Sequence, residues 1–391
     1  MTAQPHTPTN GQVRLRAGVP AVNNLLYHRI RFLVMDPAAI IDFPHSSTLI
    51  IRDIEMDRAR KHARADAVAC PADFAPNNNP AALSGDREIA TAQATAQCLK
   101  QAGVSQVTVD RTLPMIYAHE LQAVGVRVNC DPDLGILERR AKDAEEIEHL
   151  RAAQQMTERA VELACVTIAR AKPDKSGVLH HEGAPLTAER VRAIADIFLL
   201  ENEFTNASMI VAPGKQGGDC HDRGTGRIRT GESVIIDVFP RSNSTLYVGD
   251  CTRCVVHGDI PDEIAKMHAV VCEAKAAAIA ATRAGVTGEQ INNTTAAVIT
   301  KHGYHMGLPP EGAPASYTSM PHGTGHGVGL DVHEPPLLDR GGPALIKGDA
   351  ITIEPGLYRR DLGGIRIEDM VIVTDTGCDN LNTLQEGLVW K

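Results

Sequence analysis

A two-domain α+β protein is predicted from three features of this sequence: a small α/β domain over 1–138 is followed by a larger α+β domain over 139–391. Short β-type runs alternate with helical segments up to about residue 135, and such alternation is typical of an α/β domain. A strongly charged segment with apolar residues at helical spacing then begins near residue 138. Beyond it, helices and Val/Ile-rich strands follow one another, and the polar residues concentrate on the strands.

The first domain shows tail, helix, loop and strand signals. Residues 1–15 are polar and contain prolines and a glycine, so we expect a loose tail. The segment 86–103 has helical periodicity and is expected to end near Gly103. PADFAPNNNP at 71–80 is expected to be a surface loop. The expected strands are TLIIRDI at 48–54, QVTV at 106–109 and VRV at 126–128.

The second domain begins with a long expected helix. Apolar residues from Ile147 to Ile168 recur at helical spacing, which predicts one amphipathic helix over 138–171 that ends before Pro173. Further helices are expected at about 186–201, 261–283 and 287–302. The strand-like runs are SVIIDVF, TRCVVH, AITIE and IRIEDMVIVT.

Composition narrows the class of protein. The net charge is −9 and basic runs are absent from the sequence, so nucleic acid is not an expected partner. The sequence has neither a signal-peptide core nor an apolar run of membrane-spanning length, and membrane association is not expected. Nine cysteines suit reduced thiols in a cytosol, so we expect a cytoplasmic protein. Cys251 and Cys254 form a C-x-x-C on an expected strand, where the two thiols point to opposite faces and pack rather than react.

Two pairs of carboxylates lie on the expected strands. Asp237 and Asp250 flank a turn-rich segment, and a hairpin there would bring them roughly opposite each other. Glu354 and Glu368 flank Gly363-Gly364, which we expect to form a turn or bulge, so these acids could also face each other. A carboxylate within a Val/Ile strand is costly to bury unless it is paired or binds a metal. The alternative is that these acids lie in water or pair with arginines.

The segment HGTGHGVGLDVHEPP, from His322 to Pro336, contains three histidines. Its four glycines, at alternate positions, each cost about 1 kcal/mol in a helix, which excludes a helical His-x-x-x-His metal site. An extended chain places His322 and His326 on one face. One imidazole joined to four carboxylates suits manganese, with cobalt, zinc and iron as alternatives. Four negative charges also balance two divalent cations, a pair that can drive hydrolysis.

These motifs resemble those of the pita-bread-fold metallopeptidases, a family that includes methionine aminopeptidase, aminopeptidase P and prolidase. The resemblance covers about 140–391 and rests on five motifs in order: RRAKDAEEIEHLRAAQQM, IIDVFP with GDCTR, HGTGHGVGLDVHEPP, ITIEPGLY and GGIRIED. The small α/β domain before them is similar to the amino-terminal domain of the Xaa-Pro peptidase and creatinase branch. The resemblance therefore implies a creatinase-like domain followed by a pita-bread catalytic domain.

The resemblance also implies a ligand set for two divalent metal ions. Asp237 matches the acid that chelates one metal, and Asp250 matches an acid that bridges both. His326 and Glu354 match the imidazole and carboxylate ligands of the other metal. Glu368 matches the second bridging acid.

Further residues match groups that act on the substrate. His322 and His333 match histidines that contact the substrate carbonyl and support the oxyanion, and His221 matches a histidine near the scissile bond. Arg366 matches an arginine beside the bridging glutamate. The resemblance implies that water held by the two cations attacks the peptide carbonyl, with Glu354 as the proton shuttle.

The sequence departs from the family pattern in two places. Many Xaa-Pro peptidases have a tyrosine where this chain has Thr205-Asn206-Ala207-Ser208, which puts hydrogen bonding near the metals and the catalytic rate in doubt. The interval between Asp237 and Asp250 is also slightly wider than in many relatives, and a longer hairpin turn would explain it.

The expected activity is hydrolysis of Xaa-Pro bonds, with an Xaa-Pro dipeptidase (prolidase) preferred and aminopeptidase P as the alternative. The sequence alone leaves dipeptides and longer proline peptides unresolved as substrates. A creatinase-like amidinohydrolase without metal is less favoured, because all five ligand positions are intact. A non-catalytic binding protein on the same scaffold is the third alternative. Family members are commonly dimers and sometimes tetramers, so a homodimer is expected by analogy.

Overall fold

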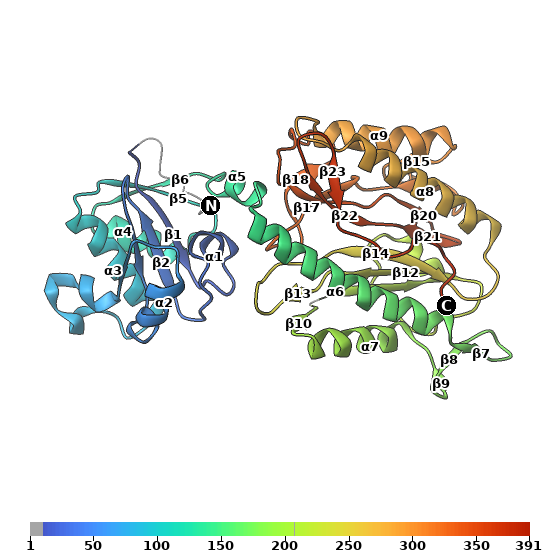
Figure 1. Ribbon diagram of the computed structural model, residues 1–391, viewed down its shortest axis with the longest axis horizontal. Helices are drawn as coiled ribbons and strands as arrows, with labels where there is room; N and C mark the ends of the chain where they lie inside the picture. Colours follow the sequence, from blue (N-terminus) through green and yellow to red (C-terminus); the bar gives the residue numbers. More distant parts are fainter. Residues whose placement is uncertain (1–10, 207) are drawn as a thin grey trace. The chain divides into compact units, whose positions relative to one another are not determined.

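The computed structural model describes residues 11–206 and 208–391, and the chain divides into two compact units, Met1–Arg139 and Arg140–Lys391 (Figure 1). The division lies one residue beyond the boundary expected from the sequence. Residues 1–10 of the expected tail lie outside the described residues, as does Ala207 of the segment that lacks the tyrosine. None of the helices in the described ranges combines the length and apolar character that crossing a bilayer requires.

The first unit is built on one six-stranded sheet with the strand order β4-β3-β2-β1-β5-β6. Its strands are β1 Arg14–Gly18, β2 Ala38–Asp42, β3 Ser47–Ile50, β4 Ala67–Ala69, β5 Gln106–Val109 and β6 Arg127–Cys130. Its helices are α1 Asn24–Ile30, α2 Met56–His62, α3 Arg87–Gln101 and α4 Met115–Ala123, and α5 Ile136–Arg140 follows at its end.

The sheet of this unit is covered by apolar packing on both faces. Ile41 packs with the buried side chains of α3 and α4, whereas its neighbour Ile40 packs with those of α1 and α2. Alternate residues of a strand point to opposite faces, so this single strand contributes to two cores. The tail expected over 1–15 is wrong at its end, because Arg14 opens β1 and Leu15 is buried in the sheet.

The second unit begins with a break in the expected long helix. The helix predicted over 138–171 is two helices, α5 and α6 Ala144–Ala169. Asp143 separates them, because its side chain accepts a hydrogen bond from the Glu146 backbone N–H and its own backbone N–H donates one to the Glu146 carboxylate. This capping box fixes the start of α6. The other helices are α7 Ala188–Glu201, α8 Asp262–Ala281 and α9 Gly288–Lys301.

Three sheets form the centre of the second unit. One contains β11 Met209–Pro213, β12 Ser233–Val238 and β14 Cys251–Val256. A second has the order β15 His305–Met306, β16 Thr318–Met320, β20 Gly356–Arg359 and β21 Gly363–Arg366. The third has the order β18 Glu334–Leu338, β17 Gly325–Gly327, β19 Ala350–Ile353, β22 Asp369–Val373 and β23 Cys378–Asn380.

Small sheets complete this unit. They pair β7 Lys172–Pro173, β8 Leu179–His181 and β9 Ala184–Pro185, and separately β10 Phe204–Thr205 and β13 Arg241–Ser242.

Helices cover both faces of the β11-β12-β14 sheet (Figure 1). Cys251 packs in the core under α6 and α7, whereas Cys254 packs in the core under α8. The two thiols of the C-x-x-C therefore point to opposite faces, as the strand pattern predicted. Both thiols are buried, and burial raises their pKa, which suits packing rather than redox chemistry.

Two turns differ from those expected. In the β12–β14 pair, Asp237 lies opposite Thr252, so Asp250 is two residues away from the position directly opposite Asp237. Gly363 and Gly364 belong to strand β21 rather than to a turn. A Cβ at Gly364 would lie 2.0 Å from the carbonyl oxygen of Gly217. These glycines thus allow close backbone packing, while the chain turns at the residues before them.

Candidate metal centre

Strand ends bring the predicted side chains together. Asp237 lies in β12, and Asp250 directly precedes β14. Glu354 follows β19 and Glu368 precedes β22, and these strands pair with Ile353 opposite Asp369. The two glutamates are therefore adjacent at the end of this strand pair. His326 is the central residue of β17, the other neighbour of β19.

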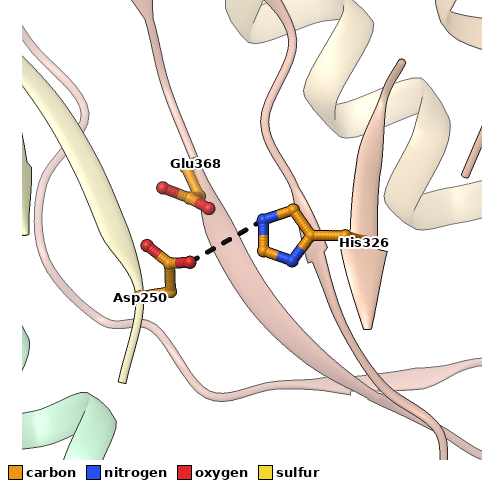
Figure 2. A group of neighbouring side chains, drawn as sticks. All are labelled: Asp250, His326 and Glu368. Atoms are coloured by element: carbon orange, nitrogen blue, oxygen red, sulfur yellow. Dashed lines mark ion pairs between the residues drawn. The ribbon is translucent and has the colours of Figure 1, made fainter. Parts of the chain in front are cut away.

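Three of these residues form a compact group. Ligand atoms of Asp250, His326 and Glu368 all lie within 4.8 Å of one another, and all three residues are buried. Figure 2 shows the three side chains pointing toward one another from separate segments of the chain. The His326 Nε2 atom lies 3.8 Å from Asp250 Oδ2 and 3.3 Å from Glu354 Oε1. Four of the five predicted ligands thus lie together: His326 and the carboxylates of Asp250, Glu354 and Glu368.

The fifth predicted ligand, Asp237, is held by an arginine. Arg366 Nη2 donates a hydrogen bond to Asp237 Oδ2 at 2.5 Å. The other oxygen, Asp237 Oδ1, is buried without a hydrogen-bond partner. A buried acceptor without a hydrogen-bond partner lowers the stability of the fold unless another group satisfies it. A cation would satisfy this oxygen, so the donor set fits divalent metal ions on the evidence of its own unpaired atom.

Burial and mutual repulsion raise the pKa of three acids. Desolvation by burial is the main cause for Asp250 and Glu368, and the charges of neighbouring carboxylates add to it. Burial likewise raises the pKa of Glu354 to about 7. Arg366 opposes these shifts. Carboxylates that resist ionisation side by side are the arrangement that bound cations stabilise.

The tautomer of His326 suits a metal ligand. Its Nδ1 lies 3.1 Å from the Gly327 carbonyl oxygen, which can only accept a hydrogen bond. The proton is therefore assigned to Nδ1, and Nε2 keeps its lone pair toward the carboxylates. Burial lowers the pKa of His326, which favours the neutral form that coordinates metals.

His322 is already bonded within the chain. Its Nδ1 lies 2.8 Å from the Gly323 carbonyl oxygen, and its Nε2 lies 2.8 Å from the Tyr358 hydroxyl. Burial lowers the pKa of His322 to about 4, so Nε2 accepts a hydrogen bond from the tyrosine. In this arrangement, both ring nitrogens are occupied. A contact between His322 and a substrate carbonyl therefore requires Tyr358 to release it.

His333 and His221 lie at the exposed side of the cluster. The His333 ring packs edge-on against His326, with centroids 4.3 Å apart at 89°. His221 follows η5 Gly214–Gly218, is exposed and lies near Glu354 and His333. Both histidines are thus placed where a molecule entering from solvent would meet them.

Sequence reasoning missed several polar residues that support the cluster. The Tyr358 hydroxyl accepts a hydrogen bond from Arg366 Nη1 at 2.9 Å, and Thr252 donates to Glu368 Oε2 at 2.7 Å. Gln154 bonds both the N–H and the carbonyl of Asp250, at 2.8 Å and 2.7 Å. Tyr358 and Thr252 lie inside motifs already noted, ITIEPGLY and GDCTR, and this was the available signal. Gln154 also lies inside a noted motif, RRAKDAEEIEHLRAAQQM, but its bonds to Asp250 depend on packing between distant segments.

Removing the Tyr358 hydroxyl tests this network. Tyr358→Phe leaves His322 Nε2 and Arg366 Nη1 without one buried partner each, so we expect the free energy of unfolding to fall by about 1 to 3 kcal/mol. Urea denaturation of the metal-free protein measures it. Tyr317→Phe is the control, because the Tyr317 ring stacks on His305 and that stacking is kept. An equal loss in both variants would contradict the proposed importance of the hydroxyl.

Comparisons with known proteins agree with this architecture. A model of metallopeptidase family M24 matches residues 148–375. The chain is 34% identical over 198 residues to a probable dipeptidase PepE of Mycobacterium tuberculosis, covering 50% of this chain and 49% of that protein. It is 34% identical over 164 residues to an Xaa-Pro dipeptidase of Pyrococcus furiosus, covering 42% and 43%. The matches thus span about half the length of these curated relatives.

Solved structures confirm the expected pita-bread fold. The chain superimposes on an Xaa-Pro dipeptidase from Bacillus anthracis with a TM-score of 0.79 at 22% identity, covering 97% of this chain and 95% of that one. It superimposes on an X-Pro aminopeptidase from Thermotoga maritima with a TM-score of 0.76 at 22% identity, covering 96% of both. At this identity the likeness establishes the fold, and it is similar for both kinds of peptidase.

Proposed function

The chain belongs to metallopeptidase family M24, and we propose that it is a dinuclear-metal Xaa-Pro dipeptidase. Asp237, Asp250, His326, Glu354 and Glu368 would hold the two cations. The observation that carries the proposal is the group of buried carboxylates around His326 Nε2, together with the unpaired Asp237 Oδ1. An oxygen-rich set with one nitrogen favours manganese among the divalent metals.

The bound cations would supply an activated water and polarise the peptide carbonyl. Glu354 is the acid suited to move a proton, because its side chain is 19% exposed whereas that of Asp250 is 4% exposed. It can take a proton from the attacking water and pass it to the leaving amine. His333 and His221, at the exposed side, are placed to donate to the carbonyl oxygen as charge develops there.

Dipeptides are the preferred substrate class, and the names of the two matched relatives support this choice. The second candidate is an Xaa-Pro aminopeptidase, which the comparable structural likeness to the Thermotoga maritima enzyme favours. A homodimer in the cytoplasm remains a prediction from the family resemblance. Light scattering of the purified protein and fractionation of cells that express it test these two points.

Substrate length decides between the two peptidase classes. With added Mn²⁺, we expect hydrolysis of Leu-Pro and little turnover of Xaa-Pro-Yaa tripeptides, because a dipeptidase must bind a free carboxylate next to the proline. Released amino acid and bound metal are measured on the same sample. Turnover of tripeptides alone would favour the aminopeptidase. A protein that does not bind metal and does not hydrolyse either substrate would be neither of the two peptidases. A non-catalytic protein that still binds metal would show metal without turnover.

A further inference from the structure

A buried ion pair lies outside the five-residue donor set. Lys142 Nζ and Glu334 Oε1 are 2.6 Å apart, and their side chains are 3% and 4% exposed. Lys142 lies just before α6, and Glu334 is the first residue of β18, directly after His333. Burying two charges carries a desolvation cost, and apolar replacements are often equally stable. Stability alone is therefore a weak explanation for this pair.

Glu334 packs against the turn that joins His326 to His333. In the β17–β18 pair, Gly327 lies opposite Glu334, and the register shifts between His326 and Gly327. A Cβ at Gly327 would lie 2.5 Å from the Glu334 carbonyl oxygen, and one at Gly329 would lie 2.6 Å from Glu334 Oε1. Both the main chain and the carboxylate of Glu334 thus touch this turn.

Glu334 is joined directly to His333, which lies in the bend before β18. Glu334 turns inward to Lys142, whereas His333 is exposed and has its ring against His326. Any movement of Glu334 would therefore displace His333 directly and His326 through the ring contact and the shared turn.

We propose that Lys142 and Glu334 are positioning residues, whose ion pair holds the turn 327–333 so that His326 and His333 face the carboxylate cluster. Neither residue touches metal or substrate in this scheme. The consequence for turnover rests on the proposed function, since it assumes that these histidines serve a metal and a substrate. The consequence for histidine geometry holds in the metal-free protein as well.

The double variant Lys142→Met/Glu334→Leu separates positioning from stability. It removes both charges of this ion pair together, so we expect a urea unfolding midpoint equal to or above that of the parent. We expect kcat on Leu-Pro to fall on the order of 100-fold, because small displacements of catalytic groups carry that penalty. We also expect the imidazole NMR signals of His326 and His333 to shift in the metal-free protein, and Mn²⁺ affinity to fall.

A second buried ion pair provides the matched control. Arg140 bonds Asp349 through Nε to Oδ1 at 2.8 Å and Nη2 to Oδ2 at 2.7 Å, with side chains 8% and 0% exposed. This pair ties the chain before α6 to the segment before β19, and its side chains bond each other, the Ala344 carbonyl and the Ile346 N–H rather than the turn 327–333. Arg140→Met/Asp349→Leu should therefore keep the parent's kcat and its histidine signals.

Three outcomes are informative. A Lys142/Glu334 double variant with parental kcat, Mn²⁺ affinity and histidine signals overturns the inference. An equal loss of kcat in both double variants also overturns the inference, because the removal of any buried ion pair would then lower kcat. If the parent itself neither binds Mn²⁺ nor hydrolyses Leu-Pro, the proposed function fails, and the histidine NMR signals alone test the positioning role. Signals that shift in the Lys142/Glu334 variant and stay constant in the control support that role. Signals that are unchanged in the Lys142/Glu334 variant refute it.

Discussion

Replacing His326 by alanine is expected to lower the bound metal from two equivalents to one or fewer, whereas His333→Ala retains both. The reason is geometric, because His326 Nε2 faces Asp250 and Glu354, and His333 packs behind its ring at the exposed side. A cation contributes several kcal/mol to the transition state, so His326→Ala should lose about 10³-fold or more in kcat/KM. Elemental analysis and Leu-Pro hydrolysis on the same preparations measure both effects.

The matched variant carries its own expectation. His333→Ala should lose about 10²-fold in kcat through a missing donor to the carbonyl oxygen, with the metal content unchanged. His322→Ala should also keep both metals, since both nitrogens of His322 bond within the chain. Loss of metal in His333→Ala but not in His326→Ala would reverse the assignment of ligand and substrate roles.

Asp250→Asn is expected to abolish turnover and yet stabilise the metal-free protein. Asp250 is buried beside Glu368 and Glu354, and burial and their charges raise its pKa, so its ionised form is unfavourable without cations. Removing that charge should increase the free energy of unfolding of the metal-free protein by about 1 to 2 kcal/mol, as is common where function opposes stability. Urea denaturation in a chelator measures the gain, and Leu-Pro hydrolysis measures the loss.

Asp349→Asn is the control, for which we expect the free energy of unfolding to change in the opposite direction. Asp349 is fully buried and paired with Arg140, so its neutralisation should destabilise the protein by about 3 to 5 kcal/mol. If Asp250→Asn is equally destabilising, Asp250 is a structural acid rather than a metal ligand.

Much of the site could be predicted from residue types and spacing. Four acids in Val/Ile-rich strands are costly without a cation, and glycines at alternate positions around His326 exclude a helix. The break in the helix expected over 138–171 could also have been predicted from the local sequence, because Asp143 and Glu146 have the spacing of a capping box. That prediction was wrong because the apolar periodicity was followed across the cap.

Strand register was harder to predict. The structure places Asp237 opposite Thr252, so Asp250 lies two residues from the directly opposite position. Similarly, Gly363 and Gly364 carry a turn signal, but packing against Gly217 makes them part of a strand. Backbone packing between segments decided both cases.

The sequence by itself determined the fold class and the kinds of donor in the cluster, and its motifs carried the resemblance to the family, because residue types, their order and local periodicity hold that information. Only the tertiary structure decided which partners hold those donors. Tyr358 bonds both His322 and Arg366, and Lys142 pairs with Glu334 across 192 positions of the chain. Such contacts depend on how strands and helices pack after the chain has folded, and local sequence patterns do not encode the distance between segments so far apart.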